Sequence, residues 1–173
     1  MSTSTEITAT QVMELRARTG AGVMDCRKAL AEAGGDLERA AELLRAKGLG
    51  MAEQKAGRAT REGLVEAYIH GNGRLGALVE VNCETDFVAR TEDFRRLARE
   101  LAMQVAATDP RYLSREDVPE AERDDPQVQE IILLEQPYIR DVGRTVQDLI
   151  TETVAKVGEN IQVRRFARFK VGE

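Results

Sequence analysis

Few residues of this chain are of a type and spacing that could perform covalent chemistry. His70 is the only histidine, and Cys83 falls with it on the predicted strands of one hairpin, so a thiol–imidazole pair is conceivable. A nucleophile of that kind also needs a third group that orients the base. No such group is evident, and a cysteine at the end of a strand is more often a small hydrophobic residue. We therefore expect a protein that is not an enzyme.

Metal and phosphate chemistry have as little support. Glu84 and Asp86 are two carboxylates on a short connection, where such side chains are usually just solvated. No G-x-x-x-x-G-K-[ST] motif for cradling nucleotide phosphates occurs. A basic run near the C-terminus could contact phosphates, although a solvated strand edge is the more ordinary interpretation; it consists of Arg164, Arg165, Arg168 and Lys170. We expect no cofactor and no bound metal.

One stretch instead suggests binding to a partner, residues 82–90, which read N-C-E-T-D-F-V-A-R. An alternating apolar run precedes it and a helical pattern begins near Thr91, so the stretch lies where a strand passes into a helix. Connections of this kind run on the surface and often carry function. Phe87 either fills the core of its own chain or projects as an aromatic anchor for a partner. The bare pattern favours the core, and both interpretations stay open.

The pattern at 8–48 predicts three short helices. Thr8 and Gln11 form a capping box at the start of the first helix, and Gly20 and Gly48 are expected ends of the first and the third. Some forty residues make a small core. Such a bundle is more typical of a docking module than of a catalyst.

The chain is expected to divide into a docking module at 1–50, a polar linker at 51–62 and a core domain at 63–173. The linker is punctuated by glycine and carries basic side chains. The charge also divides unevenly, since residues 1–61 have 10 Lys/Arg and 8 Asp/Glu whereas the remainder has 15 and 22. This asymmetry suggests two differently charged pieces.

The core domain is predicted to have an α+β fold, with a three-stranded antiparallel sheet covered by helices on one face. Strands are expected at 64–70 and 74–83, and Gly71-Asn72-Gly73 between them is a strong hairpin signal. A third strand is expected at 161–170, with a bulge near Arg164-Arg165 because the alternation slips there.

Two helices and an irregular segment complete the predicted core. Thr91 and Thr145 are expected to cap the helices, and Gly158 to end the second one. Residues 109–127 hold three of the four prolines and seven acidic residues, which predicts an exposed loop. Residues 128–134 are apolar and could form either a strand or a helix before Pro137 breaks the pattern.

Composition and charge exclude several classes of function. The 173 residues carry 25 Lys/Arg against 30 Asp/Glu, and this net charge of −5 argues against general nucleic-acid binding. No apolar run approaches the ~18 residues of a membrane span. The start at 1–5 is polar and lacks the apolar centre of a secretory signal. We therefore expect a cytoplasmic protein in which Cys26 and Cys83 remain free thiols.

Three blocks of the sequence together resemble the short form of bacterial elongation factor Ts. They are V-N-C-E-T-D-F-V-A-R at 81–90, L-R-A-R-T-G-A-G-V-M-D-C-R-K-A-L at 15–30 and V-G-E-N-I-Q-V-R-R-F at 157–166. They fall in the order of that family and span nearly the whole chain. The resemblance implies a guanine-nucleotide exchange factor for the GTPase elongation factor Tu, acting by binding alone.

The resemblance also implies two elements that grip the GTPase. A ubiquitin-associated-type three-helix module would dock on the nucleotide domain, and a wedge would enter near the Mg²⁺ site and promote GDP release. The implied docking residues are Arg16, Val23 and Met24, and the implied wedge consists of Thr85, Asp86, Phe87 and Val88. One departure concerns Val23, because the family commonly has two consecutive methionines at this place.

Two further classes of function compete with this one. The N-terminal bundle alone would suit an adaptor that binds peptides or ubiquitin, and the Cys83–His70 pair would suit a small hydrolase. Long members of the resembled family carry two core halves, whereas this chain has one, and its segment 110–133 looks abbreviated. Together with the apolar run 128–134, this suggests a homodimer.

Overall fold

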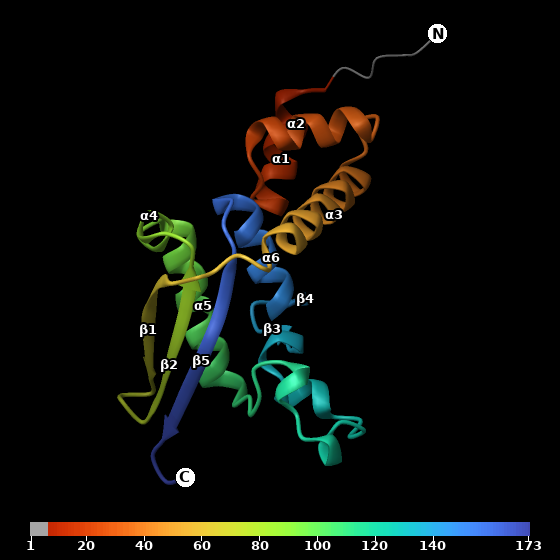
Figure 1. The fold of residues 1–173 in the computed structure, drawn as a ribbon. Helices are drawn as coiled ribbons and strands as arrows, with labels where there is room; N and C mark the ends of the chain where they lie inside the picture. The colour runs from red at the N-terminus through yellow and green to blue at the C-terminus, as the bar shows by residue number, and fades with distance from the viewer. Residues whose placement is uncertain (1–6) are drawn as a thin grey trace.

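The computed structural model describes residues 7–173 and has a mixed helix-and-sheet fold in two parts (Figure 1). The predicted polar start at 1–5 lies outside the described residues, as does the very beginning of the predicted module 1–50. Over the described range, no helix has the length and apolar character to span a bilayer. The α+β class predicted from the sequence is confirmed.

The N-terminal part is a bundle of three helices, α1 (Ala9–Thr19), α2 (Val23–Glu32) and α3 (Leu37–Lys55). The predicted capping box is present, because the side chains of Thr8 and Gln11 each accept a hydrogen bond from the other residue's backbone N–H. Gly20 ends α1 with a left-handed φ of 66°. The bundle has its own small core, formed by Val12, Leu15, Cys26, Ala29, Leu30, Ala33 and Ala40.

Helix α3 does not end at Gly48, where the sequence predicted an end. The helix continues to Lys55, so the module extends past residue 50 and the connection to the sheet shortens to residues 56–61. Gly48 is buried, and a β-carbon built on it would lie 3.6 Å from the β-carbon of Ala155 on α6. The glycine therefore serves close packing between helices, which a sequence pattern cannot distinguish from a helix end.

The main sheet has the predicted three antiparallel strands, β1 (Glu62–His70), β2 (Leu75–Cys83) and β5 (Ile161–Lys170), in the order β1-β2-β5. The predicted hairpin turn joins β1 to β2, and Gly71, Asn72 and Gly73 all have positive φ there. Figure 1 shows the long strands side by side, with β2 in the centre.

The predicted bulge lies on β5. Glu80 pairs with Arg165 but the next residue, Val81, pairs with Val163, which leaves Arg164 as the extra residue. The bulge resets the alternation, so that both Val163 and Phe166 pack toward the helices.

Two helices cover one face of this sheet, α5 (Glu92–Thr108) and α6 (Val146–Val157). Thr91 and Thr145 cap them as predicted, and Gly158 ends α6 with a φ of 75°. The fully buried hydrophobic side chains between the layers are aliphatic apart from Phe94 and Cys83. The largest of them are Phe94, Leu101, Leu133, Val79, Val81, Val105 and Val146.

Residues 109–127 of the acidic segment between α5 and α6 are mostly exposed, although Val118 is buried and short 3-10 helices form along the segment. These helices are η1 (Arg115–Asp117), η2 (Glu120–Glu122), η3 (Val128–Ile131) and η4 (Leu133–Glu135). Val118, Val128 and Ile132 are buried together in a small satellite cluster. The run 128–134 is therefore neither a strand nor a regular α-helix. Most of its apolar side chains are buried in the protein's own clusters.

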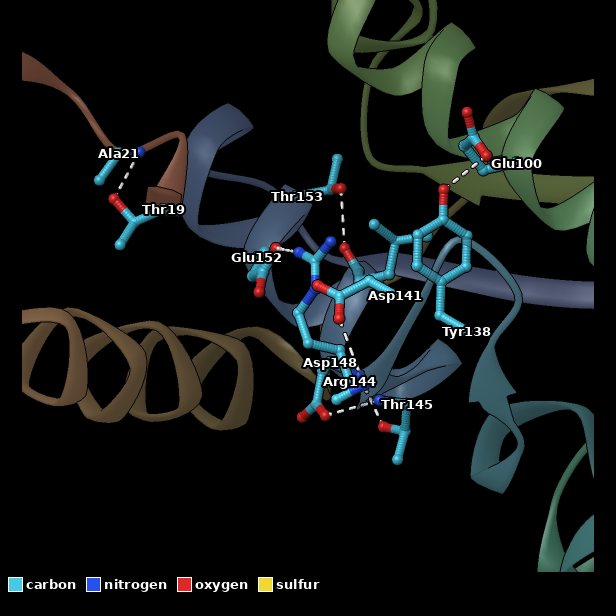
Figure 2. A network of polar contacts seen from close by, with 12 residues as sticks. Thr19, Ala21, Glu100, Tyr138, Asp141, Arg144, Thr145, Asp148, Glu152 and Thr153 are labelled. Carbon is cyan, nitrogen blue, oxygen red and sulfur yellow. Dashed lines mark hydrogen bonds and ion pairs between the residues drawn. The ribbon is translucent and has the colours of Figure 1, made fainter. Parts of the chain in front are cut away.

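A two-stranded hairpin that the sequence analysis missed leads into α6. It consists of β3 (Pro137–Tyr138) and β4 (Asp141–Thr145). Figure 2 shows how its polar groups anchor the helix: Arg144 lies between Asp141, at 2.8 Å, and Glu152 of α6, at 2.6 Å. The Thr145 backbone N–H donates to Asp148 in the reciprocal half of the helix cap. The start of α6 is thus fixed by side chains on both sides.

Packing of α3 on α6 through Gly48 gives a matched pair of variants. Gly48→Ala adds a methyl group at ordinary contact distance from Ala155 and removes a helix-interior glycine, so unfolding free energy should rise by about 0.5–1 kcal/mol. Gly48→Leu should force the helices apart and cost about 1–3 kcal/mol. Urea unfolding of both variants measures the difference. Equal stability of the two would contradict close α3–α6 packing.

Candidate partner-binding site

The predicted wedge stretch forms a short helix with a cap at each side. Thr85 caps α4 (Asp86–Ala89) by accepting a hydrogen bond from the Val88 N–H at 3.4 Å. Thr91 caps α5 in the same way, accepting from the Phe94 N–H at 3.3 Å. Two caps six residues apart leave the chain between them little freedom, because each fixes a helix start.

Phe87 projects into solvent and does not fill the core. Its exposed fraction is 77%, whereas the adjacent Val88 and Ala89 are exposed by only 9% and 8% and pack into the main core. Of the two interpretations left open by the sequence, the structure thus favours the projecting one. Val88 lies beneath the surface, so it supports the site from inside instead of offering a contact.

The two carboxylates of this stretch are engaged separately and do not form a metal pair. Asp86 makes an ion pair with Arg90 at 2.8 Å, one turn further on. Glu84 accepts from the backbone N–H of Asn160 at 2.7 Å and lies 3.5 Å from Arg58. That backbone hydrogen bond, with the Arg58 charge, lowers the pKa of the Glu84 carboxyl.

Cys83 and His70 cannot form the nucleophilic pair considered above. Cys83 pairs with Glu62 and His70 pairs with Leu75, so the two lie at opposite ends of the hairpin, roughly 25 Å apart for eight residues of strand. Cys83 is fully buried, and burial, helped by the nearby Glu159 charge, raises the pKa of its thiol to about 11. A buried, protonated thiol of this kind is a structural side chain.

The predicted docking residues lie at the corner between α1 and α2. Arg16 is exposed on α1, and Val23 and Met24 open α2 with exposed fractions of 45% and 63%. Met13 also belongs to this surface: it is 58% exposed and lies one turn before Arg16. The sequence analysis missed Met13, although its position off the buried Val12–Leu15 face was a usable signal.

Three of the four basic residues of β5 are paired within the chain. Arg165 contacts Glu80 at 2.7 Å, and Arg168 donates to the Ala106 carbonyl near the end of α5 at 3.0 Å. Lys170 pairs with Glu173. These contacts occupy three of the four basic side chains, and the bulge residue Arg164 is exposed at the strand edge.

The two candidate contact regions lie toward the same end of the molecule. Figure 1 shows α1 and α2 at the top, with α4 at the end of the sheet that faces them. The connection from α3 runs to the start of β1 at that same end. A partner large enough to span both regions could therefore contact the α1–α2 corner and Phe87 together.

Known proteins resemble this chain over most of its length. A family model described as elongation factor TS matches residues 38–127, which include Thr85–Val88. The protein named elongation factor Ts from Moorella thermoacetica is 55% identical over 195 aligned residues, covering 96% of each chain. The chain belongs to the elongation factor Ts family. The resemblance noted from the three sequence blocks is confirmed.

Other members of the elongation factor Ts family are similarly close. The relative from Carboxydothermus hydrogenoformans is 52% identical, with 96% of this chain and 90% of that protein covered. For the relative from Caldanaerobacter subterraneus the values are 53%, 96% and 98%. The 195 aligned positions exceed the 173 residues of this chain, so these relatives contain residues that it lacks. That the shortening falls at 110–133 stays a prediction.

Proposed function

We propose that this protein is the guanine-nucleotide exchange factor for elongation factor Tu. The observation that carries the proposal is Phe87, an aromatic side chain 77% exposed on a capped four-residue helix within a block that resembles the family signature. Exposed aromatic anchors held on ordered elements are typical of interface hot spots. Membership of the elongation factor Ts family supports the same function.

In the proposed mechanism Phe87 enters between helices near the Mg²⁺ site of GDP-bound elongation factor Tu. The metal is dislodged, the phosphate-binding loop loses its counter-charge, and GDP leaves. Thr85 and Val88 hold the short helix from its cap and from beneath, and Asp86 ties it to Arg90. No bond is made or broken in the factor, so the protein acts by binding and is not an enzyme in the covalent sense.

The energetics of exchange require that the factor prefers the nucleotide-free GTPase. Coupling of this kind is reciprocal, so nucleotide also weakens binding of the factor. GTP rebinding therefore releases the factor, which can then act on another GTPase. The factor itself needs no nucleotide site.

We assign docking to the α1–α3 bundle, which we interpret as a ubiquitin-associated-like module. Arg16, Val23 and Met24 would contact a helix of the nucleotide domain, and the exposed Met13 extends that surface. We place the protein in the cytoplasm, where elongation takes place. An adaptor that uses only the bundle is less well supported, because it would leave Phe87 without a role.

Replacement of Phe87 by Ala tests the wedge. An exposed side chain contributes little to folding, so unfolding free energy should fall by less than about 1 kcal/mol. Loss of an interface anchor costs on the order of 2–4 kcal/mol. At ~1.4 kcal/mol per tenfold change, GDP release should slow by roughly one to three orders of magnitude. Thermal melts and stopped-flow release of a fluorescent GDP measure both effects.

Phe94→Ala is the matched control, because Phe94 is fully buried only seven residues away. This variant should lose about 3–5 kcal/mol of stability, and its folded fraction should exchange normally. A Phe87→Ala protein that behaved like the Phe94→Ala protein would refute the wedge.

The docking surface makes a different kinetic prediction. Met24→Ala should raise the factor concentration needed for half-maximal GDP release by on the order of tenfold, equivalent to ~1.4 kcal/mol of binding. The maximal release rate should stay near that of the native protein, because the wedge is intact. Val142→Ala, at a residue 80% exposed on the β3–β4 hairpin, is the control and should change neither parameter. An unchanged half-maximal concentration for Met24→Ala would remove this residue from the docking surface.

We also propose that the protein forms a homodimer through the face of the sheet that α5 and α6 leave uncovered. This outer face is apolar toward the β1–β2 turn and carries Val65, Ile69, Leu78 and Phe169, each exposed by 45% or more. Two antiparallel sheets can pack such faces together at about 10 Å. The apolar run 128–134 on which the sequence analysis based the dimer is largely buried, so the outer face replaces it.

Light scattering at high protein concentration tests the dimer. The native chain should have twice the monomer mass, and Phe169→Asp should convert it to a monomer by placing a charge in the apolar contact. Val142→Asp serves as the control and should remain dimeric. A monomeric native protein, both free and with elongation factor Tu, would exclude this assembly.

A further inference from the structure

The turn that follows α6 lies beside the wedge, because Ile161 at the start of β5 pairs with Cys83 at the end of β2. Gly158 ends the helix in a left-handed conformation and directs the chain toward the junction of β2 and α4. There the Glu159 carboxylate accepts hydrogen bonds from the backbone N–H groups of Glu84, at 3.1 Å, and Thr85, at 3.0 Å. It also accepts from the Thr85 hydroxyl at 2.7 Å. One carboxylate therefore satisfies three donors of a segment more than 70 residues earlier in the sequence.

These hydrogen bonds act on the cap of α4. The Thr85 hydroxyl donates a hydrogen bond to Glu159, which leaves a lone pair of its oxygen free to accept from the Val88 N–H. That bond defines the first turn of α4, where Phe87 stands. Hydrogen bonds to an ionised acceptor are about twice as strong as neutral ones. Glu159 therefore holds both the backbone of the junction and the Thr85 side chain that caps α4.

The turn that bears this carboxylate is held in place by the next residue. Asn160 is 5% exposed, and its side-chain amide donates to the carbonyls of Ala56, at 3.2 Å, and Arg58, at 2.8 Å. Its backbone N–H donates to Glu84. The turn bearing Glu159 is thus bonded both to the segment that leaves the docking module and to the wedge junction.

We propose that Glu159 is a positioning residue for nucleotide exchange, which fixes the direction of Phe87 through the Thr85 cap while touching neither nucleotide nor metal. The inference rests on the proposed exchange function. Through this cap, a helix of only four residues that carries an exposed aromatic side chain gains a defined backbone position before the partner binds. Pre-organisation of this kind spares the ordering cost on association.

The experiment compares three variants of the full chain. Glu159→Ala removes all three hydrogen bonds to the junction. Glu159→Gln keeps an oxygen for the two backbone N–H groups and an amide that can donate to the Thr85 hydroxyl. Thr145→Ala removes the side-chain cap at the other end of α6, which lowers stability without touching the junction.

GDP release is measured as a function of factor concentration for each variant. Glu159→Ala should lower the maximal release rate by about tenfold, equivalent to ~1.4 kcal/mol, while the half-maximal concentration stays within about twofold, because the docking surface is intact. Glu159→Gln should recover most of the rate, and Thr145→Ala should match the native protein. A folded Glu159→Ala protein with the native maximal rate would overturn the proposal.

Amide hydrogen exchange of the free protein gives a readout that does not depend on the partner. Exchange at Thr85 and Val88 should accelerate by at least about tenfold in Glu159→Ala and stay unchanged in Thr145→Ala. If the native chain failed to accelerate GDP release, the proposed function would fall, and these amides would still decide whether Glu159 orders the junction. Unchanged protection in Glu159→Ala would refute that ordering.

Discussion

Burial of α6 on two sides is the constraint on which the rest of the molecule depends. Gly48 of α3 lies against Ala155 on one side, and Ile150 and Val154 on the other enter the core beneath the sheet. Each such apolar side chain contributes roughly 1.5–3 kcal/mol when fully buried. Because a single helix is shared by the bundle and the sheet, the module cannot pivot freely about its short connection. The same helix delivers the turn at Gly158 to the wedge junction.

The candidate site depends on a sharp change of environment between neighbouring residues. Phe87 is in water while Val88, next to it, is in the core, and a helix of four residues has no intrinsic stability to maintain that difference. The position of this helix is stabilised by its cap, by the contacts of Val88 in the core and by the Glu159 carboxylate. An exposed aromatic ring is therefore supported by polar and apolar groups that are mostly hidden from a partner.

Local signals predicted much of the fold, because helix caps, the hairpin turn and the sheet alternation are encoded by neighbouring residues. Thr8, Thr145 and the Arg164 bulge are examples. Gly48 was misinterpreted because its neighbour Ala155 is distant in sequence. The exposure of Phe87 could not be derived from its own block, since it depends on how that short helix is rotated. Glu159 stands in the quoted block 157–166, but its role could not be derived from that block, because its hydrogen bonds reach residues more than 70 positions earlier.

The bulge on β5 determines which side chains of the strand face the core and which face solvent. Because Arg164 is the extra residue, Phe166 faces the helices and Phe169, three positions later, is 71% exposed on the opposite face. Deletion of this extra residue would leave the pairing of Arg165 with Glu80 and the faces of the strand unchanged, whereas deletion of a residue between the bulge and Phe169 would turn Phe169 toward the helices. A change of length between the bulge and the end of the strand would therefore exchange a core residue for a surface one, which a substitution does not do.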